Sequence, residues 1–300
     1  MYQYHDTDYA EFILKNGFTT QYFLTELKLL ALYYRDVLGY KPKKRKEELY
    51  KFCEENIAKY NKVLFFRTID KALNYARKKT SKLIDIDFIP IYKTEVDYIK
   101  NLDIEYNLQK IIFTILVYIK LNKKVREIKM GDVSDEYFLP KNKTDKDIFK
   151  LTNISNVKNY SHLFYLLEQI EYITTYYSGA TRINILYDMP IDKTDIAIEI
   201  RDYSNIGYYY DYYNKVNRVK LCVKCGMPFK AGSNSAKYCI QCTRKINTVK
   251  TIKCEKCKKE FEINSKNKRK LCDNCYLEHR KDIINKNAKK YYQKSKENKE

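Results

Sequence analysis

Eight of the nine cysteines lie after residue 221, where they form four Cys-x-x-Cys pairs separated by 13, 11 and 14 residues. A Cys-x-x-Cys turn directs two thiolates at one point, and two such turns supply the four soft ligands that tetrahedral Zn²⁺ favours. The sequence therefore predicts two zinc ions. The eight expected ligands are Cys222, Cys225, Cys239, Cys242, Cys254, Cys257, Cys272 and Cys275.

Disulfides and iron–sulfur clusters are the competing uses of such thiols. The first residues carry no basic segment and no cleavage site of an export signal, so we expect a cytoplasmic protein whose thiols stay reduced. Two similarly spaced four-cysteine sets are more typical of structural zinc than of an iron–sulfur cluster.

The cysteine-rich region is an internal repeat. Two cysteines and a phenylalanine recur 32 residues later, and the second cysteine pair recurs 33 residues later. Each unit reads as a cysteine knuckle, an aromatic residue, a polar hairpin and a second knuckle, which is the pattern of a zinc ribbon. We expect neighbouring pairs to share a metal, in ribbons over 221–246 and 252–276. Such units cannot fold on a hydrophobic core, so metal binding, at about 10–16 kcal/mol per site, decides whether they fold.

Positive charge is concentrated in the same region. The formal net charge is +20; residues 215–300 hold 25 Lys+Arg against 8 Asp+Glu, a net of +17, whereas residues 1–214 hold 33 against 30, a net of +3. Four thiolates around each Zn²⁺ lower the local value to about +13. This uneven distribution of charge indicates that the region binds a polyanionic partner; solubility alone would not require the positive charges to be concentrated in one region. The expected phosphate contacts are Lys230, Lys237, Lys266, Lys268, Arg269 and Lys270.

Residues 277–300 read as a basic helical tail. Its apolar stripe is thin, so the pattern suits a helix along nucleic acid or in solvent better than one on an anionic membrane. No apolar run approaches the ~20 residues of a membrane span.

The middle of the chain, residues 91–205, predicts a winged helix-turn-helix. Helical patterns over 105–122, 145–151 and 155–170 precede a hairpin with strands near 173–177 and 182–187. The third helix would enter a major groove and the hairpin would be the wing. The candidate DNA contacts are Lys158, Asn159, Ser161, His162 and Arg182. An ordinary α+β core is the alternative.

Residues 1–90 predict an all-helical domain, and the whole chain is expected to be mostly α with small β. Helices are expected from Thr19 or Thr20 to Leu38, over 47–58 and over 63–79, with Lys41–Lys46 as a basic loop and Cys53 as a packing residue. Pro90 predicts a connector, and residues 206–220 read as a linker to the ribbons.

The sequence lacks the catalytic residues that three classes of enzyme would require. No histidine lies between the knuckles, as an HNH nuclease requires, no His-x-Glu precedes a cysteine pair, as a zinc deaminase requires, and no phosphate-binding P-loop is present. Acidic groups such as Asp85/Asp87 are typical of loop surfaces. We therefore expect no enzymatic activity.

The stretch 219–246, with Cys-Val-Lys-Cys-Gly-Met-Pro-Phe and Lys-Tyr-Cys-Ile-Gln-Cys, resembles the ribbon that ends many proteins from phages, plasmids and other mobile elements of low-GC Gram-positive bacteria. Those proteins usually carry one ribbon before a basic helix, whereas here a second ribbon separates the two. The resemblance implies a bacterial or phage protein with DNA-binding parts and no established activity.

Together these patterns predict a zinc-dependent protein that binds double-stranded DNA, a regulator or accessory factor of a mobile element. An adaptor whose ribbons bind another protein, and an RNA-binding protein, are the alternatives. The sequence leaves the oligomeric state and the target site open.

Overall fold

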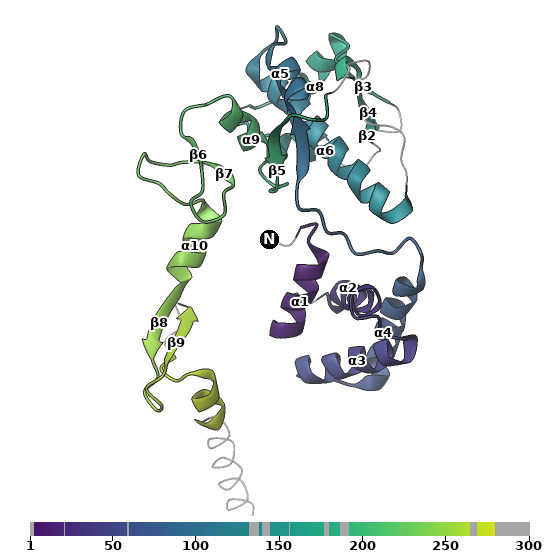
Figure 1. Ribbon diagram of the computed structural model, residues 1–300, viewed down its shortest axis with the longest axis vertical. Coiled ribbons are helices and arrows are strands. Elements are labelled where there is room, and N and C mark those ends of the chain that lie inside the picture. Colours follow the sequence, from purple (N-terminus) through teal and green to yellow (C-terminus); the bar gives the residue numbers. More distant parts are fainter. Residues whose placement is uncertain are drawn as a thin grey trace, which may run out of the picture. The chain divides into compact units, whose positions relative to one another are not determined.

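The computed structural model describes residues 3–20, 22–58, 60–131, 138–139, 145–155, 157–176, 180–186, 192–264 and 269–279. The chain divides into two compact units, 1–217 and 218–300 (Figure 1). It is mostly helical with small antiparallel sheets, as predicted.

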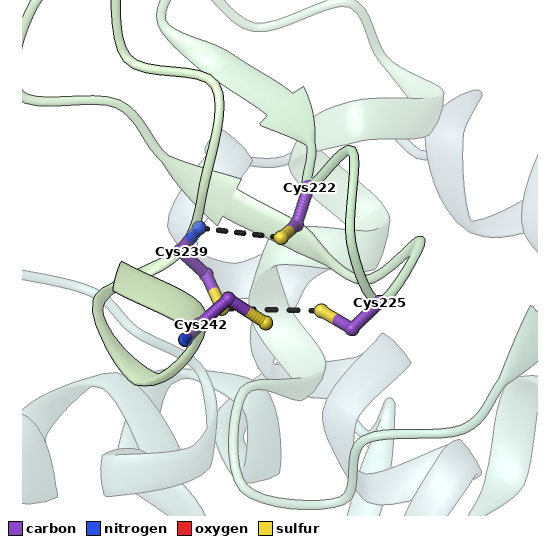
Figure 2. A group of neighbouring side chains, drawn as sticks. All are labelled: Cys222, Cys225, Cys239 and Cys242. Atoms are coloured by element: carbon purple, nitrogen blue, oxygen red, sulfur yellow. Dashed lines mark hydrogen bonds between the residues drawn. The ribbon is translucent and has the colours of Figure 1, made fainter. Parts of the chain in front are cut away.

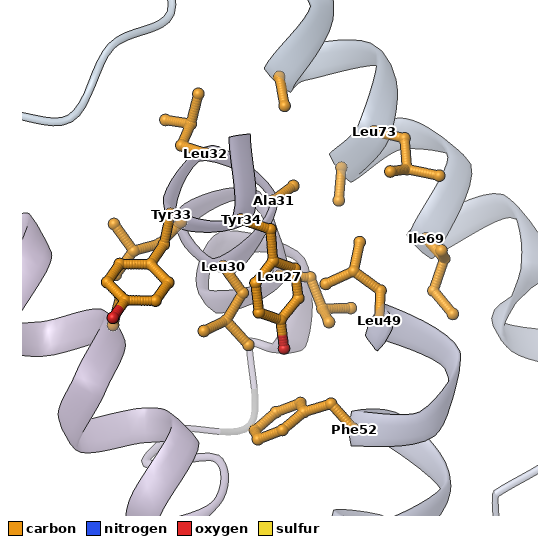
Figure 3. Packing of buried hydrophobic residues seen from close by; sticks show 14 of the residues in the cluster. Leu27, Leu30, Ala31, Leu32, Tyr33, Tyr34, Leu49, Phe52, Ile69 and Leu73 are labelled. Atoms are coloured by element: carbon orange, nitrogen blue, oxygen red, sulfur yellow. The ribbon is translucent and has the colours of Figure 1, made fainter. Parts of the chain in front are cut away.

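Four helices open the first unit: α1 (Asp6–Asn16), α2 (Phe23–Asp36), α3 (Pro42–Asn56) and α4 (Lys62–Arg77). Helix α2 is central and contacts the other three. Because its neighbours surround it, α2 is buried at nearly every position from Glu26 to Tyr34. Leu27, Leu30 and Tyr34 lie in the bundle core, where Leu49 and Ile69 meet them from α3 and α4 (Figure 3).

Two details of this bundle differ from the prediction. Helix α2 begins at Phe23 because Thr19 bonds the buried carboxylate of Glu26 through its hydroxyl and backbone N–H instead of capping the helix. The basic run 41–46 is not a loop, because Pro42 starts α3 and the run forms its first turn. Cys53 is fully buried in the bundle core, as expected of a packing residue.

The rest of the first unit surrounds the long helix α6 (Tyr106–Met130). Residues 111–117 of α6 are all fully buried, so this stretch of the helix is covered on every side. The strands β1 (Ile89–Tyr92) and β5 (Ile196–Ile200) pair antiparallel, and α5 (Lys93–Lys100) follows β1. The connector predicted at Pro90 is therefore wrong. Proline is tolerated in this strand because a two-stranded sheet has only edges.

A second sheet has the strand order β2-β4-β3, from β2 (Phe138–Leu139), β3 (Ile173–Thr175) and β4 (Thr181–Ile183). Two short helices lie between β2 and β3 in sequence: α7 (Asp145–Leu151) and α8 (Tyr160–Gln169). Both contact α6. A 3-10 turn (Asn184–Leu186) ends this segment. The helix predicted to start at 155 or 156 instead starts at Tyr160, because the side chain of Asn159 accepts from the backbone N–H of His162 and caps it.

The linker predicted over 206–220 is wrong for its first half. Residues Ile206–Tyr213 form helix α9, whose Tyr210 is fully buried against Phe113 of α6. Lys110 of α6 pairs with Asp211 of α9 at 2.6 Å, with both side chains less than 10% exposed. Tyr-rich sequence is thus core here, not a connection.

The second unit holds two short hairpins. In the first, β6 (Val219–Leu221) pairs with β7 (Pro228–Lys230); in the second, β8 (Val249–Lys253) pairs with β9 (Glu260–Asn264). Helix α10 (Ile240–Thr248) lies between them in sequence, and residues 273–279 form a further helical segment. The tail predicted over 277–300 lies outside the described residues beyond position 279.

Candidate metal centres

The first knuckle begins directly after strand β6. Gly226 donates its backbone N–H to the carbonyl of Cys222 at 2.8 Å, and Cys222 donates to Met227 at 2.9 Å. The turn needs a left-handed residue after the second cysteine, and Gly226 supplies it with φ +69°. This fold of the backbone brings the side chains of Cys222 and Cys225 to one side.

The second knuckle comes from the start of α10. Cys239 precedes the helix and Cys242 lies in its first turn. The four side chains converge from the two knuckles, as Figure 2 shows. All four sulfurs lie within 4.8 Å of one another, and the Sγ atoms of Cys225 and Cys239 are 3.9 Å apart. Sulfurs bound to one Zn²⁺ at about 2.3 Å in a tetrahedron lie ~3.8 Å apart, so the cluster has the size of a metal site.

The second ribbon repeats this geometry. Cys254, Cys257, Cys272 and Cys275 also lie within 4.8 Å of one another, with 3.6 Å between the Sγ atoms of Cys257 and Cys272. Lys258 donates its backbone N–H to Cys254 at 2.9 Å with φ +60°, as Gly226 does in the first ribbon. The pairing of neighbouring Cys-x-x-Cys motifs is therefore confirmed.

Backbone hydrogen bonds prepare one sulfur of each cluster to be a thiolate. Desolvation acts to raise the pKa of Cys222, but backbone N–H groups outweigh it, including that of Cys239 at 3.4 Å from Sγ, and the pKa falls to about 6. The equivalent Cys254 accepts from the backbone N–H of Cys272 at 3.4 Å, and its pKa also falls to about 6.

In each cluster another cysteine has a raised pKa. Desolvation and the neighbouring sulfurs raise the pKa of Cys225 and of Cys275 to about 12. Four thiolates in contact repel one another in a partly desolvated site, and a dication removes that repulsion. The donor set thus fits a soft divalent metal ion, and each cluster can hold one.

Little else holds these units together. Among the described side chains of the first ribbon, the buried hydrophobic cluster consists of two cysteines with Phe229 and Ala231, and Pro228 is buried beside it. So small a core cannot offset the conformational entropy of the chain, which leaves metal binding as the main source of stability.

The expected phosphate contacts differ in their surroundings. Lys230 and Lys237 are exposed on the first ribbon. Lys270 is exposed but pairs with Glu255 at 2.8 Å. Arg269 pairs with Asp273 at 2.6 Å, is only 23% exposed and lies over the rings of Phe261 and Tyr276, so its role is to pack the second ribbon. Lys266 and Lys268 lie outside the described residues.

The candidate contacts of the first unit are also only partly available. Lys158, Ser161 and His162 are exposed at the start of α8. Asn159 uses its side-chain oxygen to cap that helix. Arg182 is half-buried in β4, which is flanked by β2 and β3, rather than at the tip of a hairpin.

The first ribbon exposes two apolar side chains that the sequence analysis did not predict as functional. The knuckle residues Val223 and Ile240 are 72% and 70% exposed, whereas the corresponding positions of the second ribbon are Glu255 and Asp273. Their exposure places the side chains of Val223 and Ile240 on the solvent side of their knuckles. Reading the inner residues of each Cys-x-x-Cys pair would have indicated this apolar surface.

Within the described residues, no helix combines the length and the apolar character that crossing a bilayer requires. Comparison with protein-family models, curated proteins and solved structures gave no match to this chain.

Proposed function

We propose that this is a zinc-dependent DNA-binding protein without catalytic activity, a regulator or accessory factor of a phage or other mobile element. Each four-cysteine cluster binds one Zn²⁺. The first unit reads double-stranded DNA, and the ribbons contact its phosphates.

The observation that carries the proposal is the order of elements in residues 106–183. The order α6, β2, α7, α8, β3, β4, with strand order β2-β4-β3, supports the proposal because a winged helix-turn-helix, in which the third helix reads DNA, would have the same order. An ordinary α+β core, the alternative, does not require this order of elements.

The start of α8 supplies the reading side chains in this proposal. Ser161 and His162 lie exposed in its first turn, and Tyr165, one turn further along, is 53% exposed. The N-terminal residues of a recognition helix are those that contact base edges. Lys158, just before the helix, suits a phosphate contact because its charge is exposed.

The ribbons add contacts that carry no sequence information. Lys230 and Lys237 present exposed charges on a support made rigid by metal. A rigid cation loses less side-chain entropy on binding phosphate than one on an unfolded segment does.

Selection from random duplex DNA tests the proposal, comparing the full chain with a chain ending at Asn217. A motif retained by the shorter chain, and lost when Ser161 and His162 are replaced by alanine, supports reading by α8. Gln169→Ala, exposed at the far end of the same helix, is the matched control. No enrichment of any motif by either chain contradicts the proposal, and preference for single-stranded RNA in competition favours the RNA alternative.

The exposed Val223 and Ile240 favour a second candidate function for the first ribbon, contact with a protein partner. Apolar side chains at the knuckle tips gain nothing from a phosphate backbone, whereas they bury well against a protein surface. Reading by α8 and a protein contact by the first ribbon are compatible in one molecule.

A further inference from the structure

A pocket in the first unit is bordered by the strands β1 and β5 and by the C-terminal half of α6. Its volume is about 400 Å³, which lies in the range of pockets that hold small molecules. Its lining residues come from β1 and the residue before it, from α5, from α6, and from β5 and the loop before that strand. Apolar and charged side chains both line this pocket, and each kind suits a different part of a ligand.

The apolar lining comes from the two-stranded sheet. Burial alternates along β1, where Ile89 and Ile91 are buried and Pro90 and Tyr92 are half-buried. Because successive residues of a strand point to opposite faces, Pro90 and Tyr92 share the less buried face. Tyr92 pairs in register with Ile196 of β5, whose side chain is 44% exposed. Pro90, Tyr92 and Ile196 all line the pocket and give it an apolar surface.

One ion pair holds α6 and β1 together beside this surface. The carboxylate of Glu95 is fully buried and accepts from Nζ of Lys120 at 2.5 Å and from the backbone N–H of Tyr92 at 2.9 Å. The ammonium of Lys120 also donates to the carbonyl of Pro90 at 3.1 Å and lies 4.3 Å from the centre of the Tyr92 ring. These contacts fix the position of the Tyr92 ring, so a ligand would not need to order this part of the pocket.

The charged lining has an excess of positive charge. The described lining residues include four lysines and two glutamates, a net charge of +2: Lys120, Lys123, Lys124, Lys193, Glu95 and Glu127. Each glutamate bonds one lysine, since Glu95 pairs with Lys120 and Glu127 pairs with Lys124 at 3.4 Å. Lys123 on α6 and Lys193 before β5 bring the other two positive charges. A pocket with this balance of charge attracts an anionic group.

We propose that this pocket binds a small molecule with an apolar body and one anionic group, a carboxylate or a phosphate. The body packs on Pro90, Tyr92 and Ile196, and the anionic group lies near the ammonium groups of Lys123 and Lys193. A ligand without charge would gain nothing from the lysines, and an inorganic anion would gain nothing from the apolar surface. The inference depends on neither the zinc sites nor the proposed DNA contacts, because other residues of the first unit carry it.

The dye anilinonaphthalene sulfonate has this chemistry, and its fluorescence rises when it leaves water. Titration of the full, zinc-loaded chain with the dye should show a saturable site. Replacing both Lys123 and Lys193 by glutamine should weaken that site about tenfold, because two attractions to the sulfonate are lost. Lys93→Gln, exposed at the start of α5 and outside the lining, is the matched control and should bind the dye as the natural chain does.

Two further comparisons assign the parts of the ligand. Naphthylphenylamine, which resembles the dye without its charge, should bind the natural chain and the double lysine variant equally. Ile196→Ser should weaken the binding of both dyes, because each loses apolar contact. Naphthoate and naphthyl phosphate differ only in the anionic group, so the one that displaces the sulfonate dye at the lower concentration identifies the preferred group.

Three results would overturn the proposal. They are the absence of saturable dye binding by the natural chain, equal dye binding by the natural chain and the double lysine variant, and failure of both naphthoate and naphthyl phosphate to displace the dye. If the double variant does not fold, as circular dichroism would show, Lys193→Gln alone replaces it. Because Lys193 is exposed in a loop, that single variant keeps the fold, and it should weaken dye binding about threefold.

Discussion

Gly226 and Lys258 occupy the same position in the two metal centres, directly after the second cysteine of the first knuckle. Their φ values are +69° and +60°, and each donates its backbone N–H to the first cysteine of its ribbon, at 2.8 and 2.9 Å. Two copies of one turn therefore place a glycine and a lysine in the same left-handed conformation. That conformation favours glycine, so the second ribbon carries backbone strain that the first does not.

Lys258→Gly should relieve this strain and tighten zinc binding by the second ribbon roughly fivefold, which corresponds to about 1 kcal/mol. Gly226→Lys should weaken the first ribbon by a similar factor. A Cβ atom at Gly226 would meet nothing within 4 Å, so backbone strain is the only new cost. Competition with a chromogenic chelator measures both affinities.

The control for the first of these variants is Lys259→Gly, which removes the same charge at the next position, where φ is not positive. It should loosen the second ribbon slightly, because glycine adds freedom to the unfolded chain. Equal effects of the two lysine variants would show that charge, and not backbone conformation, controls affinity.

Removal of the metal should unfold the second unit and leave the first intact. The ribbons depend on metal ligation, whereas the helical bundle and the α6 region have apolar cores of their own. Metal analysis of the reduced protein should find two zinc ions per chain, and one in Cys225→Ser. Cys53→Ala, which alters the ninth cysteine in the bundle core, should keep both.

Chelation followed by thiol titration should separate the cysteines by environment. The eight ligands should react within minutes once the metal is gone, whereas Cys53 should react only in denaturant. Burial raises the pKa of Cys53 to about 12, so the thiolate that attacks the reagent is scarce in the folded bundle even at pH 8. Rapid reaction of nine thiols after chelation alone would mean that the bundle opens with the ribbons.

The metal ligands could be read from sequence because ligation depends on residue type and on local spacing. The strand inserted between α6 and α7 could not, because β2 has only two residues and owes its existence to pairing with β4. The cap of α8 could be predicted only in part, as Asn159 shows. Its type signals a helix cap, but several polar residues precede α8, and the geometry of the backbone selects among them.

Helix α9 was missed for a different reason. Its sequence is a run of tyrosines without helical periodicity. The helix is positioned by contacts with two residues that are distant in the sequence. Lys110 pairs with Asp211, and Gly207 allows close approach, since a Cβ there would lie 1.7 Å from the carbonyl oxygen of Thr152. Contacts between residues this far apart in the sequence, 101 residues for Lys110 and Asp211, leave no local pattern.

Breaking the Lys110–Asp211 pair should destabilise the first unit strongly. In Lys110→Met the buried carboxylate of Asp211 loses its ion pair. Among the described side chains it then keeps one donor, the hydroxyl of Tyr106 at 2.9 Å. We expect the free energy of unfolding to fall by about 3–5 kcal/mol. Urea unfolding followed by circular dichroism measures the loss. The double variant Lys110→Met/Asp211→Leu should recover much of it, because no unpaired charge remains. A loss of under about 1 kcal/mol in the single variant would show that α9 is not anchored by this pair.

Salt dependence of duplex binding separates the two roles proposed for the first ribbon. If the protein neutralises about five phosphates, the logarithm of the binding constant should fall with the logarithm of salt at a slope near −4.5. Replacing both Lys230 and Lys237 by glutamine should make the slope shallower by about 1.8, since each phosphate contact contributes about 0.9. Val223→Ser/Ile240→Ser, in the same ribbon, should leave both slope and affinity unchanged, because these side chains carry no charge and do not face the metal. If instead the lysine variant binds as the natural chain does and the apolar variant loses affinity, the first ribbon does not act on the phosphate backbone, and its knuckle tips serve another contact.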